Sequence, residues 1–458
     1  MPPKESDALL SGDNNDQQRR RNKFGKHLSL DDEKLRSKIH TIATTIAEST
    51  ESSTTSTTAA SDADDETGSG SYKLIEKHQG KSFFDYYIFN DGPDSIGSNG
   101  YNTYVSKTKA EELNLIHVDD DNENSKNEEG NNNGNKEDSN NGAVYISSSK
   151  GTNENDRNPT TGTIYRNSVR LEGKRRFDNG LIILDVDQMP TGCGVWPAFW
   201  TTDETNWPDH GEIDIVEPIN NQNIVKTALH TNEYCDMYSH VPRWNWTGSW
   251  DVATGIPDTY TGKLNFNNKL ESDNCDVMTP HQWANQGCVA ISDKNNTLGH
   301  GMNQNGGGIY VLEWDPIGGY IKSWVFPRTD DIPINLQQSL LNTNNNDDDD
   351  DDETTIIDPS SWSILPYAYF AIGNNSGCSA NHFQNHRIVI NLAFCGTVAG
   401  NRFATDCPVL YKKYNKLTGY RNSSVAACNA YIDSNEVQEV LNNDAYWKIN
   451  GVYLYQRE

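Results

Sequence analysis

The chain has 458 residues, of which 34% are hydrophobic and 22% charged, and its formal net charge is -27. Such an acidic excess argues against a nucleic-acid binder, because affinity for phosphates depends on basic patches. No stretch approaches the roughly 18 consecutive apolar residues of a membrane-spanning helix. The sequence therefore predicts a protein that neither binds nucleic acid nor spans a membrane.

Three segments are too polar to build a core. Residues 1–71 are rich in Ser, Thr, Asp, Asn and Gln, while 118–142 and 342–357 contain runs of Asn and Asp. Burial of so little apolar surface does not offset the entropy lost on ordering. We therefore expect a disordered tail at 1–71 and one domain at 72–458 with two low-complexity insertions. Within the tail, Ser29 and Asp32 form a capping box, which predicts a marginal helix there.

From Tyr72 onward the pattern is that of an all-β protein, with short apolar or alternating runs separated by Gly, Pro, Asn and Asp. The runs "RNSVRLEGKRRF" and "GLIILDVDQM" predict two neighbouring strands. "GGGIYVLEW", "DPIGG" and "YIKSWVF" predict a hairpin, and "HRIVINLAF" and "YWKINGVYLYQ" predict further strands. Many short strands with turns between them favour a sandwich or jelly roll of two packed antiparallel sheets.

Eight cysteines lie in this part of the chain, and none forms a C-x-x-C metal pattern. An even number of scattered cysteines favours disulfides in an oxidising compartment, whereas buried free thiols would be the reading for a cytosolic protein. Four glycosylation sequons point the same way, at Asn245, Asn295, Asn374 and Asn422. The start "MPPKESDALLSGDNN" lacks the apolar run of a secretory signal. We expect an extracellular or cell-wall protein whose leader is missing or unconventional.

The stretch "WPDHGEIDIVEPIN" carries three acids that do not fit one regular strand. Glu212 and Asp214 are two apart and share a face, but Glu217 falls out of that alternation. A β-bulge near Ile215 and Val216 would reset the alternation and bring all three acids to one face. A solvated acidic face is the alternative.

Aromatic residues precede the acids. Trp196, Phe199, Trp200 and Trp207 lie within a few residues of Glu212. Aromatic rings cover the apolar faces of sugars well, although core packing is the alternative for Phe199 and Trp196. Paired carboxylates flanking a glycosidic bond are what its hydrolysis requires, and a third acid between them would help keep one of them protonated.

The motif "GEIDIVE", preceded by "GCGVWPAFW" and followed by "ALHT", resembles the active-site region of glycoside hydrolase family 16, specifically its fungal laminarinase-like endo-β-1,3(4)-glucanases. The resemblance extends over roughly residues 72–457. It implies a β-jelly roll with a concave substrate cleft and a retaining mechanism. Carried over by position, it makes Glu212 the nucleophile, Asp214 the assisting acid and Glu217 the general acid/base.

The sugar-binding residues predicted from the aromatic pattern and the resemblance are Trp196, Trp200, Trp207 and His230. A structural histidine is the alternative at His230, which shares a strand face with Ala228. We expect a monomeric enzyme without cofactor or metal, which cleaves β-1,3 or mixed β-1,3/1,4 glucans. The alternatives are a glucan transglycosylase using the same site and a non-catalytic glucan-binding lectin, although binding alone needs no matched acid pair. Retention predicts that the two glutamate carboxyls lie roughly 5 to 5.5 Å apart.

Overall fold

The computed structural model describes residues 70–94, 98–119, 142–151, 165–238, 241–253, 255–258, 263–265, 270–280, 282–342, 356–374, 376–418 and 422–458. The helix expected in the tail lies outside these residues, as does most of both predicted insertions. The described residues belong to one compact unit, Gly68–Glu458.

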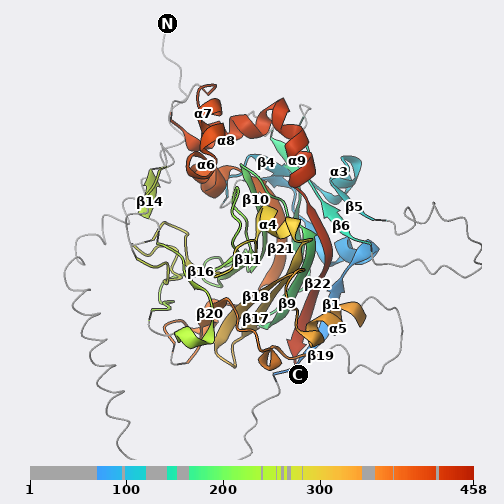
Figure 1. Cartoon of the computed structure of the whole chain (residues 1–458), viewed down its shortest axis with the longest axis vertical. Coiled ribbons are helices and arrows are strands. Elements are labelled where there is room, and N and C mark those ends of the chain that lie inside the picture. Colours follow the sequence, from blue (N-terminus) through green and yellow to red (C-terminus); the bar gives the residue numbers. More distant parts are fainter. Residues whose placement is uncertain are drawn as a thin grey trace, which may run out of the picture. The chain divides into compact units, whose positions relative to one another are not determined.

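Two large antiparallel sheets form this unit (Figure 1). The nine-stranded sheet has the order β19-β1-β22-β9-β17-β18-β20, and β6 joins it at β22 with β5 at its side. Its strands are β1 (Tyr72–His78), β5 (Ile116–Val118), β6 (Val144–Ile146), β9 (Gly180–Gln188), β17 (Gly308–Asp315), β18 (Tyr320–Pro327), β19 (Ile356–Ile357), β20 (Ala368–Ala371) and β22 (Trp447–Arg457). Strand β19 lies inside the range expected to be low-complexity insertion and pairs with β1.

The eight-stranded sheet has the order β13-β16-β12-β11-β10-β21-β8-β2. Its strands are β2 (Tyr87–Phe89), β8 (Arg170–Gly173), β10 (Val195–Thr202), β11 (Glu212–Val216), β12 (Lys226–His230), β13 (Ser249–Trp250), β16 (Cys288–Ile291) and β21 (Arg387–Phe394). Two small sheets complete the strands: β3 (Gly92–Pro93), β4 (Asn102–Tyr104) and β7 (Arg166–Ser168) form one, and β14 (Gly255–Asp258) and β15 (Lys263–Asn265) form the other.

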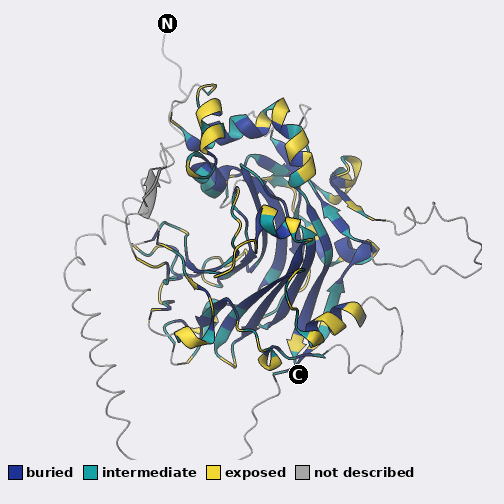
Figure 2. Ribbon diagram, in the orientation of Figure 1, coloured by how far each residue is buried: buried dark blue, intermediate teal, exposed yellow. Residues whose placement is uncertain are grey.

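The main core lies between the two sheets, where buried strands face one another (Figure 2). Alternate residues of each strand point into it, such as Ile182 and Leu184 of β9 and Ile388 and Ile390 of β21. The intervening residues of β21 therefore lie on the opposite face of the eight-stranded sheet, which we call its outer face. The jelly-roll sandwich expected from the sequence is confirmed.

One expected arrangement is wrong. The runs "RNSVRLEGKRRF" and "GLIILDVDQM" do form successive strands, β8 and β9, but these strands do not pair. Strand β8 pairs with β2 and β21 in one sheet, while β9 pairs with β17 and β22 in the other. The segment between them crosses from one sheet to the other, as sandwich connections commonly do.

Helices are more frequent than the sequence indicated. The α-helices are α3 (Lys107–Glu112), α4 (Gly299–Gln304), α5 (Ile334–Asn342), α6 (Asn401–Asp406), α7 (Pro408–Tyr414), α8 (Ser424–Asp433) and α9 (Gln438–Asp444), and short turns of other helix types are η1 (Gly80–Tyr86), η3 (Arg243–Asn245), η5 (Pro359–Ser361), η6 (Ala380–His382), η7 (Gly396–Gly400) and η8 (Asn435–Val437). Helices α6 to α9 pack with the ends of β10 and β21 around a second core. Among the helices of the described segments, none combines the length and apolarity needed to cross a bilayer.

All eight cysteines are paired, as expected. The disulfides join Cys193 to Cys407, Cys235 to Cys378, Cys275 to Cys288 and Cys395 to Cys428. Two of them attach the helical region to the sheet, through β10 and β21. Four disulfides indicate that the chain folds in an oxidising environment.

Candidate active site

A β-bulge in β11 organises the candidate site. In the pairing with β10, Val216 lies opposite Phe199 and Asp214 lies opposite Trp200, so Ile215 has no partner across the ladder. This is the bulge predicted from the spacing of the acids. It occurs because one extra residue is inserted between two regular pairs.

The bulge separates apolar from acidic side chains. Ile213, Ile215 and Val216 all pack in the core between the sheets. The chain therefore turns two successive side chains inward, and Glu217 returns to the outer face on which Glu212 and Asp214 lie. There the Trp196 indole N–H donates a hydrogen bond of 2.7 Å to Glu217 Oε1.

His230 joins the acids from the neighbouring strand β12, where it lies opposite Glu212. Its Nε2 is 2.8 Å from Asp214 Oδ2 and 4.0 Å from Glu212 Oε1. Ligand atoms of these three residues lie within 4.8 Å of one another, so their donor set could also hold a metal ion. The absence of a metal from the reaction stays a prediction.

Burial raises the pKa of all three acids. It raises the pKa of Glu212 to about 8, of Asp214 to about 7 and of Glu217 to about 8. The charge of Asp214 adds to the shift of both glutamates, whereas the Trp196 hydrogen bond opposes it at Glu217. Because closely spaced like charges disfavour joint ionisation, the acids titrate as a set that retains protons at neutral pH.

The predicted aromatic residues take three different positions. Trp196 is 9% exposed and packs beside Ala393 and Ala399. Trp200 is half-buried and donates its indole N–H to Asn391 Oδ1 at 2.8 Å, with the Arg170 guanidinium over its ring. Phe199 lies in the core. Trp207 is 39% exposed, on the loop that connects β10 to β11.

Asp203 holds that loop and was not identified from the sequence. Its carboxylate is fully buried and accepts hydrogen bonds from the Thr205 backbone and from the side chains of Asn206, His210, Asn385 and Arg176. Burial alone would raise the pKa of Asp203, but these hydrogen bonds hold it well below its usual range. Three of these donors are local, at Thr205, Asn206 and His210, but Arg176 and Asn385 come from distant parts of the chain, which no local pattern reveals.

Asn391 was also missed, although the sequence carries a signal for it. It is the polar residue within the apolar run "IVINLAF", and it is buried. A buried amide in such a strand needs a hydrogen-bonding partner. Here that partner is Trp200, so Asn391 fixes an aromatic ring on the outer face.

Comparisons with known proteins identify relatives that are glucanases. A family model described as the XgeA-like catalytic domain of glycoside hydrolase family 16 matches residues 150–455. An endo-1,3(4)-beta-glucanase of Arthroderma benhamiae is 31% identical over 395 residues, which are 86% of this chain and 66% of the relative. A probable endo-1,3(4)-beta-glucanase of Aspergillus fumigatus is 30% identical over 391 residues, which are 85% of this chain and 46% of the relative. The chain thus spans about half the length of some of the relatives it matches.

Two solved structures share the fold at 26% sequence identity. Laminarinase 16A from Phanerochaete chrysosporium, with β-glucans in both donor and acceptor sites, aligns with a TM-score of 0.59. An elongating family 16 β-1,3-glucosyltransferase aligns with a TM-score of 0.58. Each alignment covers 84% of this chain and all of the other.

Proposed function

The chain belongs to glycoside hydrolase family 16, and from this premise we propose that it is an endo-acting, retaining glycosidase that cleaves β-1,3 or mixed β-1,3/1,4 glucans. The observation that carries the proposal is the bulge in β11. It brings two glutamates and an aspartate to one face, where their titrations are coupled. A lectin would gain nothing from this arrangement, because binding a neutral sugar does not require buried acids that resist ionisation.

In the proposed mechanism, Glu217 protonates the glycosidic oxygen while a carboxylate oxygen of Glu212 attacks the anomeric carbon. The C–O bond to the leaving sugar breaks and a covalent glycosyl-enzyme ester forms. Glu217, now anionic, then takes a proton from water, whose oxygen attacks the same carbon and releases Glu212. The raised pKa of Glu217 suits its first task, because a carboxyl with a pKa near 8 still carries its proton at neutral pH.

Two contacts of the acids bear on this division of roles. Trp196 donates to Oε1 of Glu217, so the proton to be transferred belongs on Oε2. Glu212 has the opposite requirement, since a nucleophile must be anionic. Burial and the charge of Asp214 raise the pKa of Glu212, and the charges of His230 and Arg170 oppose that rise. Because His230 lowers the pKa of Glu217 as well, Arg170 is the neighbour that favours the anion at Glu212 in particular. We assign Asp214 to hold His230 and to couple the two glutamates electrostatically.

We also propose that Trp200, Trp207 and His230 contact sugar rings, because their side chains lie on the outer face or on the adjoining loop. Trp196 faces the acids through its N–H, and its ring is nearly covered. Its proposed contribution is therefore the orientation of Glu217. We further propose that the protein acts as a monomer outside the cell or in the cell wall.

Reducing-sugar release from laminarin and from lichenan tests the proposal. Glu212→Gln and Glu217→Gln should each reduce turnover by at least about 10³-fold, since both keep the shape and remove the ionisable role. Asp214→Asn should cost less and shift the acidic limb of the pH profile. Glu111→Gln, a change at an exposed acid of α3 outside the triad, is the matched control. Near-normal hydrolysis by either folded glutamate variant would contradict the assignment.

The anomer formed first decides the stereochemistry. Retention predicts that NMR detects the β-anomer before mutarotation, whereas the α-anomer would indicate inversion and the wrong carboxyl spacing. The likeness to a glucosyltransferase is the reason to test for transglycosylation as well, in which a sugar hydroxyl replaces water. Products longer than the supplied oligosaccharide would identify that activity.

A further inference from the structure

Three loops meet at the end of the eight-stranded sheet where β11 begins. They are the β10–β11 loop (203–211), the segment after β12 (231–238) and the segment before β21 (376–386). Asn232 Nδ2 donates to Asp209 Oδ1 at 2.9 Å, which connects the first two loops. His386 Nε2 donates to the His210 carbonyl at 2.6 Å, which connects the first to the third. The three loops therefore form one connected rim, which also carries Trp207.

Tyr234 is unusual within this rim. Its side chain is 81% exposed, and its backbone has a φ of 73°, in the left-handed region that favours glycine. A bulky residue in this conformation carries an energetic cost and persists only where its surroundings enforce it. An exposed ring recovers little of that cost through packing. The ring thus contributes little to the stability of the fold.

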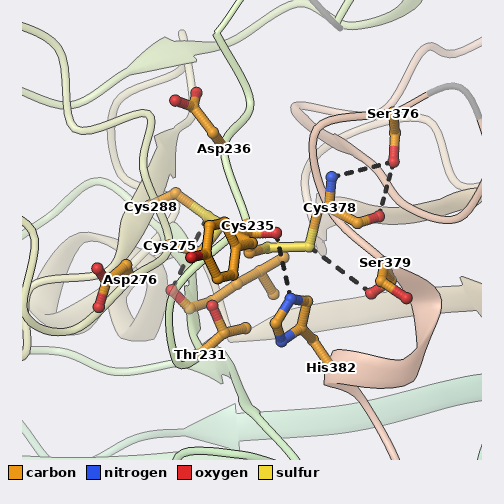
Figure 3. Close-up of a disulfide and its surroundings, with 12 residues drawn as sticks. Thr231, Cys235, Asp236, Cys275, Asp276, Cys288, Ser376, Cys378, Ser379 and His382 are labelled. Atoms are coloured by element: carbon orange, nitrogen blue, oxygen red, sulfur yellow. Dashed lines mark hydrogen bonds between the residues drawn. A yellow bond between two sulfur atoms is a disulfide. The ribbon is translucent and has the colours of Figure 1, made fainter.

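The surroundings of Tyr234 hold its backbone on several sides. The next residue, Cys235, is joined to Cys378, and this disulfide lies beside the Cys275–Cys288 disulfide (Figure 3). His382 Nε2 donates to the Tyr234 carbonyl at 3.2 Å.

Two backbone hydrogen bonds extend this support. The Cys275 N–H donates to the Cys235 carbonyl at 2.9 Å, and the Asp236 N–H donates to the Gly377 carbonyl at 3.0 Å. The ring is exposed, but its backbone attachment is rigid.

We propose that Tyr234 is the platform of an additional sugar-binding subsite, which takes a glucosyl residue of a β-glucan chain beyond those bound next to the acids. The inference rests on the proposed function and extends it to the length of substrate that the enzyme recognises. A rigid aromatic ring covers the apolar face of a pyranose while losing little conformational entropy on binding. The strained backbone is the feature that this role explains, because glycine would suit the loop better if no ring were needed there.

Two variants separate the ring from the backbone. Tyr234→Gly removes the ring and accepts the positive φ without strain, so the loop should keep its conformation and the melting temperature should not fall. Tyr234→Phe keeps the ring and removes only the hydroxyl. Both variants are assayed with laminarin oligosaccharides of increasing length and with laminarin itself.

We expect Tyr234→Gly to raise KM about 3- to 10-fold for the long substrates, with kcat unchanged and the short substrates unaffected. Tyr234→Phe should resemble the wild type. The proposal is overturned if Tyr234→Gly leaves KM unchanged at every length, raises it equally at all lengths or markedly lowers the melting temperature. It is also overturned if Tyr234→Phe loses as much as Tyr234→Gly. If the wild type hydrolyses no β-glucan, the proposed function itself fails.

Discussion

Replacement of Trp196 by phenylalanine should move the basic limb of the pH–activity profile to higher pH. The Trp196 N–H lies 2.7 Å from Glu217 Oε1 and favours the anion of that acid, so its removal raises the pKa of Glu217. A hydrogen bond to a charged group contributes about 1.5–3 kcal/mol, and one pKa unit corresponds to about 1.4 kcal/mol. The greatest expected shift is therefore about one to two units, and water reaching the freed oxygen would reduce it toward one.

The assay is kcat/KM on laminarin across the pH range, because its basic limb reports the general acid of the free enzyme. Trp200→Phe is the matched control, since it removes an indole hydrogen bond of similar length, 2.8 Å, whose acceptor is the Asn391 side-chain oxygen rather than an acid. The control should change activity without moving the basic limb. If the basic limb of folded Trp196→Phe moves no further than that of the control, Trp196 does not act through the ionisation of Glu217.

Three other predictions follow from the same structure. Glu217→Gln should raise the melting temperature at pH 8 but not at pH 4. The folded-state pKa of Glu217 is raised from 4.5 to about 8, so its stabilising contribution in the wild type is complete below the unfolded-state pKa and is lost as the pH rises through 8. Equal changes in melting temperature at both pH values would contradict this. Asp203→Ala should lower the free energy of unfolding by about 3 kcal/mol at pH 7, as measured by denaturant titration. Because the pKa of Asp203 is lowered in the folded protein, its carboxylate stabilises the fold at pH values above the unfolded-state pKa, and the difference in stability between wild type and variant should narrow as the pH falls through the folded-state pKa. A loss of stability that does not depend on pH would exclude the charge of Asp203 as its cause. A chain limited to 72–458, with the segment between α5 and β19 shortened, should retain hydrolysis of laminarin, and a large loss in folded protein would show that a removed segment contributes to the site.

The sequence was sufficient to predict the sandwich and the bulge because both depend on local periodicity. Alternation along "RIVINLAF" and the hairpin turn "DPIGG" specify strands independently of their partners. The bulge followed from a single misplaced acid, since burying Glu217 among Ile213 and Ile215 would be too costly. Such predictions need only the chemistry of neighbouring residues.

The sequence was insufficient where long-range contacts decide the structure. Helix α8 (Ser424–Asp433) lacks the broad polar face that would identify a surface helix in the sequence. It packs against α6 and η7, and the Cys395–Cys428 disulfide joins it to the residue that follows β21. The assignment of β8 and β9 to different sheets depends on partners far along the chain. Asp203 is similar, because one of its donors, Asn385, is 182 residues away.

The order of the acids in β11 also has a geometric reason. Between Glu212 and Val216 the strand uses four residue steps while its partner β10 advances only three, from Thr202 to Phe199. Glu217 therefore lies about 14 Å from Glu212 along the sheet, at roughly 3.4 Å for each of four partner steps. For the two carboxyls to approach within the roughly 5.5 Å of a retaining pair, each must lean inward by about 4 Å. Glutamate is long enough to do so, and the shorter Asp214 between them is directed to His230 instead.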